Sequence, residues 1–99
     1  MVTFIEHGET IHLHFEGDIN FETVRKIEVK IRDWIVPSHT KKITLDFQKV
    51  KFVDSTGVGF LISRIHPLTS RYQVEINNAS LPVKNILQIC KLDSLVKIL

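Results

Sequence analysis

The 99-residue sequence predicts an α/β domain in which helices cover a mixed β-sheet, with its elements in the order ββαβαβαβ. Runs of β-forming residues alternate with stretches in which apolar residues recur every three or four positions, which is typical of helices packed on a sheet. The first two strands are joined by a tight turn and must run antiparallel, whereas strands joined through helices run parallel. The length corresponds to one domain, spanning residues 1–99.

The chain opens with a predicted hairpin, formed by residues 2–6 and 10–16 around the turn sequence His7-Gly8-Glu9. The second strand has one apolar and one polar face, because its residues alternate. Ile11, Leu13 and Phe15 point one way, and His12, His14 and Glu16 point the other. The apolar face is expected to join the core.

A first helix is expected over residues 21–36, between the N-cap residue Asn20 and Pro37, which cannot continue a helix. Its apolar residues fall on one stripe: Phe21, Val24, Ile27, Ile31, Trp34 and Ile35. We expect this stripe to cover the sheet, with Trp34 largely buried.

A third strand is predicted over residues 42–47, followed by a second helix that begins within Asp54-Ser55-Thr56-Gly57 and ends at Pro67. The positions expected to face the core are spaced as on one side of a helix: Val58, Leu61, Ile62 and Ile65. Leu61 should therefore be largely buried.

A fourth strand is predicted over residues 72–76, and Ser80 with Pro82 indicates the start of a third helix. Four residues of that helix are expected to point inward: Val83, Ile86, Leu87 and Cys90. Cys90 is thus interpreted as a buried small apolar residue. Residues 95–99 supply the last strand.

Composition limits the classes of function. Thirteen Lys and Arg against eleven Asp and Glu give a net charge of +2, which does not favour a nucleic-acid partner. Cys90 is the only cysteine, so no internal disulfide forms and a reducing compartment is indicated. The N-terminus lacks the pattern of a signal peptide, and no run approaches the roughly 18 apolar residues of a membrane helix. We expect a cytoplasmic protein with no membrane partner.

The start of the second helix holds the most informative residues. A serine such as Ser55 at this position most often satisfies free backbone N–H groups. Asp54 is either a helix-start carboxylate stabilised by the helix dipole, or it orients the serine hydroxyl or the groups that react with it. Thr56 is interpreted as structural. Gly57 and Gly59 each disfavour a helix by about 1 kcal/mol relative to Ala, which predicts that a neighbour or partner approaches the backbone closely there.

The sequence does not favour an enzyme. His12, His14 and Glu16 share one strand face and could hold a metal, but strand alternation alone explains polar residues there, so no metal site and no cofactor is predicted. A Ser-His-Asp hydrolase is also disfavoured, because Ser55 lacks the Gly-x-Ser-x-Gly turn that presents a catalytic serine. No catalytic residue is therefore assigned.

Four segments together resemble a known family. They are Phe52-Val53-Asp54-Ser55-Thr56-Gly57-Val58-Gly59, the preceding strand Ile43-Thr44-Leu45-Asp46-Phe47, the strand exit Phe15-Glu16-Gly17-Asp18-Ile19, and the end of the third helix over 87–93. Their sequence and order resemble the STAS domains of sulphate transporters and bacterial anti-sigma factor antagonists. The resemblance implies a STAS-like mixed sheet with helices packed on it.

The resemblance also implies a function in transcription regulation. In the antagonists, the serine that follows the aspartate is phosphorylated by the cognate anti-sigma factor, a kinase with a GHKL-type fold; the matching residue here is Ser55. The unphosphorylated antagonist binds the anti-sigma factor and frees a sigma factor, and a PP2C-type phosphatase restores this form. The partner surface is expected around the start of the second helix and the preceding loop, and the residues assigned to it are Asp18, Asp54, Ser55, Thr56, Gly57 and Val58.

Other readings remain open at this stage. The runner-up is a STAS adaptor of another assembly, such as a signalling scaffold or the cytoplasmic partner of a lipid transporter, and a small hydrolase or metal enzyme is the rival from another class. Lys91 stands where the family usually has glycine, which predicts a third helix without a left-handed glycine cap. The family's fourth helix is not contained in full. The protein could be a monomer or a weak dimer.

Overall fold

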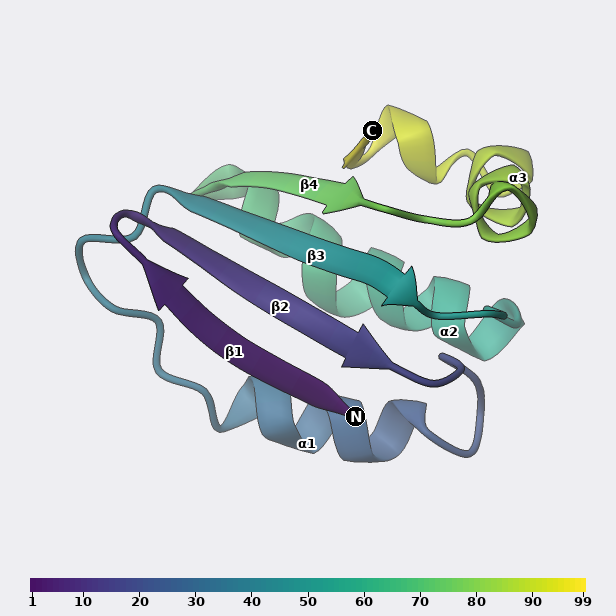
Figure 1. Cartoon of the computed structure of the whole chain (residues 1–99), viewed down its shortest axis with the longest axis horizontal. Helices are drawn as coiled ribbons and strands as arrows, with labels where there is room; N and C mark the ends of the chain where they lie inside the picture. The colour runs from purple at the N-terminus through teal and green to yellow at the C-terminus, as the bar shows by residue number, and fades with distance from the viewer.

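The computed structural model describes residues 1–99 and contains the predicted α/β arrangement (Figure 1). The strands are β1 (Val2–His7), β2 (Thr10–Glu16), β3 (Lys42–Lys49), β4 (Gln73–Asn77) and β5 (Lys97–Ile98). The helices are α1 (Val24–Arg32), α2 (Ser55–Phe60) and α3 (Leu81–Ile89). The order ββαβαβαβ is therefore confirmed.

The five strands lie in the sheet in chain order, β1-β2-β3-β4-β5. β1 and β2 pair antiparallel, and every later pair is parallel, so the sheet is mixed as expected. Helices α1 and α2 lie on one face of the sheet, and the other face is left open (Figure 1). No helix is both long and apolar enough to span a bilayer.

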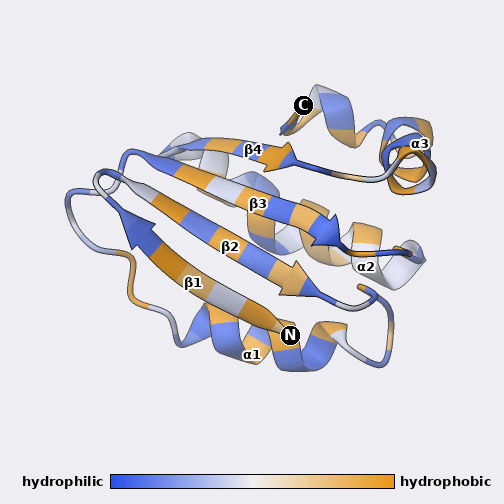
Figure 2. Cartoon of the chain, in the orientation of Figure 1, coloured by the Kyte–Doolittle hydropathy of each residue, from blue (hydrophilic) through white to orange (hydrophobic).

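The core lies between the sheet and the helices. Along β2 and β3, hydrophobic and hydrophilic residues alternate (Figure 2), and the apolar ones are buried: Ile11, Leu13 and Phe15 in β2, and Ile43, Leu45 and Phe47 in β3. The rings of Phe15 and Phe47 meet edge to face, with centroids 5.4 Å apart. The predicted two-faced character of β2 is confirmed.

Helix α1 is shorter than predicted at both ends. The Asn20 side chain accepts hydrogen bonds from the backbone N–H groups of Glu22 and Thr23, which holds residues 21–23 in a turn, and Thr23 becomes the N-cap. Phe21 therefore lies outside the helix, with its side chain 70% exposed. The prediction that it covers the sheet is wrong.

The C-terminal end of α1 differs for a second reason. The helix ends at Arg32, and Trp34 leaves the helical path to stack on Phe4 of β1, with ring centroids 4.6 Å apart. Trp34 is thereby half-buried, but Ile35 turns outward and is 87% exposed, contrary to its predicted place on the stripe.

The helical segment after α2 changes its winding. Residues Leu61–Ile65 form a π-helical turn and His66–Ser70 a 3₁₀ turn, so Pro67 sits in the first positions of that turn, where its missing N–H is tolerated, and does not end the segment. Leu61 is fully buried as predicted, whereas Ile62 is 42% exposed and Phe60 is buried instead.

Helix α3 begins as predicted, with the Ser80 hydroxyl accepting from the backbone N–H of Val83. Val83 and Leu87 are buried and Ile86 partly so, but Cys90 is exposed because it stands at the C-cap, where the chain leaves the helix. Its predicted burial is wrong. Lys91 itself adopts the left-handed conformation (φ 60°) usually given to glycine, so the cap forms without one.

Candidate partner-binding face at the start of helix α2

The predicted site residues gather at the edge of the sheet where the parallel strands β2, β3 and β4 end. Three loops follow these strands at that edge, over residues 17–23, 50–54 and 78–80. The carboxyl edge of a parallel sheet is where loops of an α/β fold most often form binding sites. We call the surface formed by these loops and the first turns of α2 and α3 the carboxyl-edge face.

The loops after β2 and β3 are joined directly. At Gly17 the chain has φ +86°, a left-handed conformation that glycine adopts without strain, and it then turns back toward β3. Ile19 forms a parallel bridge with Val53; its N–H donates to the carbonyl of Phe52 at 3.0 Å, and its own carbonyl accepts from the N–H of Asp54 at 3.2 Å. The backbone immediately before Ser55 is thus fixed by the preceding loop.

Asp54 is the N-cap of α2 and holds both loops. Its Oδ1 accepts a hydrogen bond from the Gly57 N–H at 2.8 Å, and its Oδ2 accepts from the Phe21 N–H at 3.1 Å. No hydrogen bond joins the Asp54 carboxylate to the Ser55 hydroxyl. The geometry supports the structural role of Asp54 over the orientation of the serine hydroxyl.

Position 57 requires glycine because the backbone of Ile19 approaches it closely. A Cβ atom there would lie 2.2 Å from the carbonyl oxygen of Ile19 and 2.8 Å from Cγ1 of Val53. The expectation of close packing at this glycine is confirmed. At Gly59 a Cβ would meet nothing within 4 Å, so no neighbour within the chain explains that glycine.

The six residues assigned to the partner surface lie together but differ in accessibility. Ser55 and Thr56 are the first two residues of α2, and both are exposed. Asp18 and Asp54 are half-buried, while Gly57 and Val58 are buried beneath them. The Ser55 hydroxyl has no hydrogen-bond partner within the chain, which leaves its oxygen free for a reaction or a contact.

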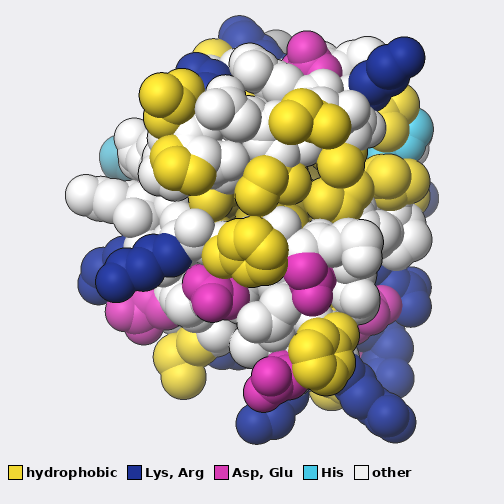
Figure 3. Space-filling model, turned by 90° about the vertical axis from the view of Figure 1, so that its right-hand side faces the viewer, with side chains coloured by type: hydrophobic (Ala, Val, Ile, Leu, Met, Phe, Trp, Pro, Cys, Tyr) yellow, Lys and Arg dark blue, Asp and Glu magenta, His cyan; other side chains and the backbone are white.

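Sequence reasoning missed the exposed apolar side chains of this face. Each of the three loops or the turn after it carries one: Phe21 (70% exposed), Phe52 (49%) and Leu81 (70%). Figure 3 looks onto this side of the molecule and shows hydrophobic side chains gathered across it, with acidic side chains beside them. For Phe52 a signal existed, because alternation next to the buried Val53 places it outward.

Comparison with known families matches nearly the whole chain. The model of the STAS domain family matches residues 2–99. Among solved structures, the anti-sigma factor antagonist SpoIIAA in its unphosphorylated form aligns with a TM-score of 0.76 and 23% identity, covering 100% of this chain and 88% of that one. The phosphorylated form of SpoIIAA, from Bacillus, gives 0.69 and 22%, with 100% and 91% covered.

Two further structures show the same fold at lower identity. An anti-sigma factor antagonist from Mycobacterium paratuberculosis has a TM-score of 0.84 and 18% identity, covering 99% of this chain and 83% of that one. A sulfate transporter family protein from Wolinella succinogenes has 0.75 and 13%, with 91% and 73% covered. Thus the same architecture occurs both in anti-sigma factor antagonists and in transporter proteins.

Proposed function

Because this chain belongs to the STAS domain family, we propose that it is an anti-sigma factor antagonist whose binding to an anti-sigma factor is controlled by phosphorylation of Ser55. The observation that carries the proposal is the exposed Ser55 hydroxyl, which has no partner within the chain and lies on the carboxyl-edge face. A kinase can reach such a hydroxyl without unfolding any part of the domain. The protein is then a regulatory binding module of the cytoplasm and not an enzyme.

The apolar side chains of the carboxyl-edge face support a protein partner. Protein interfaces draw most of their binding energy from a few aromatic or large apolar side chains that become fully desolvated. Phe21, Phe52 and Leu81 are available for this role, and the loops that carry Phe21 and Phe52 are held by Asp54 and the Ile19–Val53 bridge. A rigid frame with exposed anchors lowers the entropy lost on binding.

Phosphorylation would act on binding through charge. A phosphoryl group adds about −1.5 to −2 charges at pH 7. A partner that excludes water from Ser55 would have to desolvate this group next to the Asp54 carboxylate, and an uncompensated buried charge costs on the order of 3–5 kcal/mol. That corresponds to roughly two to three and a half decades in affinity. No conformational change is required.

The proposal includes the partners that the switch needs. The anti-sigma factor is expected to be a GHKL-type serine kinase that binds the unphosphorylated protein and releases a sigma factor, and a PP2C-type phosphatase would reverse the modification. SpoIIAA, whose fold this chain shares, exists in unphosphorylated and phosphorylated forms, which supports a modification of this kind. We assign Asp18, Asp54, Thr56, Gly57 and Val58 to the surface or support around Ser55.

A second function is favoured by one observation. The fold also matches a sulfate transporter family protein, so the domain could act as a STAS adaptor within a transporter assembly or signalling scaffold. In that case the carboxyl-edge face would bind a different partner, and a GHKL-type kinase would neither bind the protein nor modify Ser55.

The deciding experiment begins with the protein purified from its own cells together with any bound kinase. Titration calorimetry with that kinase and nucleotide compares the wild type, the protein phosphorylated on Ser55, and Ser63→Ala. Ser63 is an exposed serine in the π-helical turn that follows α2 and serves as the matched control. We expect tight binding of the wild type and of Ser63→Ala, and at least 100-fold weaker binding of the phosphorylated form. Equal affinities for all three would reject the switch.

A further inference from the structure

The open face of the sheet carries a row of histidines that the proposed function does not use. His12 and His14 both project from β2 on the side opposite the buried Leu13, with ring centroids 6.3 Å apart. His7, at the end of β1, has its ring 6.2 Å from that of His12. All three belong to the hairpin, and strand alternation and register place them on the sheet face opposite the core, the face that no helix covers in Figure 1.

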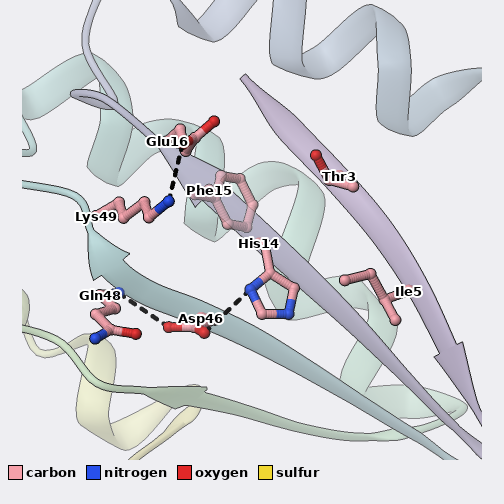
Figure 4. Close-up of a pocket in the computed structure, with 8 residues that line it drawn as sticks. All are labelled: Thr3, Ile5, His14, Phe15, Glu16, Asp46, Gln48 and Lys49. Carbon is pink, nitrogen blue, oxygen red and sulfur yellow. Dashed lines mark hydrogen bonds and ion pairs between the residues drawn. The ribbon is translucent and has the colours of Figure 1, made fainter.

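The neighbouring strand β3 holds both β2 rings by the same nitrogen. His14 Nδ1 lies 3.1 Å from Oδ2 of Asp46, and His12 Nδ1 lies 2.6 Å from Oγ1 of Thr44. In the tautomer in which each ring donates from Nδ1 to its oxygen, the lone pair on Nε2 is free to bind a metal ion. In Figure 4 the second ring nitrogen of His14 points away from Asp46. Thus both Nε2 atoms are without a protein partner on the same open face.

This arrangement matches the surroundings of metal-binding histidines in proteins. Such histidines almost always donate their other ring N–H to a carboxylate, a carbonyl or another oxygen, which fixes the tautomer and makes the ligating nitrogen more basic. Asp46 supplies that carboxylate for His14, and Thr44 supplies a hydroxyl for His12. Asp46 is in turn fixed by the Asn78 side chain and the Gln48 N–H, which donate to its Oδ1 at 3.2 and 2.9 Å.

We propose that His12 and His14 bind one divalent late first-row transition metal ion, such as Zn²⁺, through their Nε2 atoms. Two imidazoles bound to one zinc ion at about 2.0–2.1 Å place their ring centroids roughly 5–6 Å apart, so the observed 6.3 Å requires only a small rotation of each ring. No group of three or more His, Cys, Asp or Glu side chains could hold an ion in this structure, so the two histidines would be its only protein ligands and water would fill the other positions.

There is space for an ion beside His14, although His12 does not line the same cavity. The ring lines a solvent-open cavity of about 240 Å³ between β1, β2 and β3, which has room for a hydrated ion (Figure 4). Glu16, which the alternation places on the same strand face, is paired with Lys49 at 3.2 Å and is not counted among the proposed ligands. Strand alternation explains why His12 and His14 lie on the open face. It does not explain why residues of β3 contact both rings at Nδ1.

The test uses the full chain in a Cys90→Ser background, because an exposed thiol binds zinc by itself. Zn²⁺ is titrated by calorimetry, and the histidine ring nitrogens are followed by long-range ¹H–¹⁵N NMR. We expect one ion per chain, with the Nε2 signals of His12 and His14 shifting together. His12→Gln and His14→Gln should each weaken binding at least tenfold, and Asp46→Asn should weaken it roughly tenfold or more while both histidines remain.

The matched control is His39→Gln. His39 is also an exposed histidine held by a carboxylate, with Nε2 2.8 Å from Oε1 of Glu6, but no second histidine ring pairs with it. This variant should bind Zn²⁺ as the parent does. Circular dichroism identifies any variant that fails to fold, and such a variant is excluded. The remaining variants and the NMR signals of the parent then show whether His12 and His14 bind the ion. Absence of saturable binding, or affinities unchanged by His12→Gln and Asp46→Asn, would overturn the proposal. No partner protein enters the experiment, so its result is independent of the proposed switch.

Discussion

The carboxylate of Asp54 accepts a hydrogen bond from the backbone N–H of Phe21, 33 positions earlier in the chain, while it caps helix α2 through Gly57. One side chain therefore holds both the helix that presents Ser55 and the loop that presents Phe21. The shape of the carboxyl-edge face depends on these two hydrogen bonds. Substitutions of Asp54 can remove one bond or both, which allows the contribution of each to be measured.

Asp54→Asn should separate the two functions of this side chain. Asparagine is as good an N-cap as aspartate, so its carbonyl oxygen can retain the Gly57 hydrogen bond, but its amide cannot accept from Phe21. Asp54→Ala loses both. We expect a loss of unfolding free energy of about 1 kcal/mol for Asn and about 2 kcal/mol or more for Ala, measured by urea denaturation. Equal losses for the two variants would mean that the Gly57 hydrogen bond contributes nothing, and no loss for Asp54→Asn would mean the same of the contact with Phe21.

Substitutions of Ser55 should change regulation without changing the fold. Ser55→Ala should bind the anti-sigma factor as the unmodified protein does and resist phosphorylation. Ser55→Asp should bind more weakly, although less so than the phosphoprotein, because a carboxylate carries less charge and fewer oxygens. The circular dichroism spectra of all forms should superimpose, since Ser55 is exposed. A molten spectrum for the phosphorylated form would contradict this prediction.

Gly57 and Gly59 form a matched pair in one helix. Gly57→Ala places a Cβ against the Ile19 carbonyl and should destabilise the domain by about 1–3 kcal/mol. Gly59→Ala meets open space and should stabilise it by roughly 0.5–1 kcal/mol, because glycine disfavours a helix. Thermal denaturation measures both. A larger residue such as Leu at position 57 would disturb the fold itself, so loss of binding in that variant would not report on the interface.

Phe52→Ala should weaken partner binding without affecting stability. Its side chain is half-exposed and outside the core, so the unfolding free energy should change by less than about 0.5 kcal/mol. Affinity for the anti-sigma factor should fall by at least tenfold if Phe52 becomes desolvated in the complex. Ile35→Ala is the control, because Ile35 is equally apolar and more exposed but lies after α1, outside the three loops. Calorimetric titration should show no change for it.

Leu61→Ala, in contrast to Phe52→Ala, should strongly reduce stability. Leu61 is fully buried, so truncation should lower the unfolding free energy by about 2–5 kcal/mol, which is a large fraction of the stability of a domain of this size. Ile62→Ala, at the exposed neighbouring position, should lower it by much less. Similar losses for the two variants in chemical denaturation would contradict the exposed position of Ile62.

The sequence predicts the elements of this fold well because its apolar residues follow the periods of strand and helix. Ile11, Leu13 and Phe15 show the period of two, and Val24, Ile27 and Ile31 the period of a helix, so the layers follow directly. The ends of the elements depend on interactions that no period describes. Asn20 holds a turn instead of starting the helix, and stacking on Phe4 draws Trp34 away from the helical path.

The candidate site was only partly predictable for a related reason. The position of Ser55 and Asp54 at a helix start follows from local sequence, and the close approach at Gly57 follows from the cost of glycine in a helix. The second hydrogen bond of Asp54 and the exposure of Phe21 depend on a contact between distant loops. An apolar residue at the end of a helical stripe is indistinguishable from a core residue until that contact is known.

Because of the bridge between Ile19 and Val53, the carboxyl-edge face forms late in folding. Its two residues belong to loops separated by α1 and β3, so the face forms only after a long segment of chain has closed on itself. A nascent or partly unfolded chain contains the Ser55 motif but cannot present it between the two loops. Such molecules would not compete for the regulatory partner, so only completely folded copies of the protein would bind it.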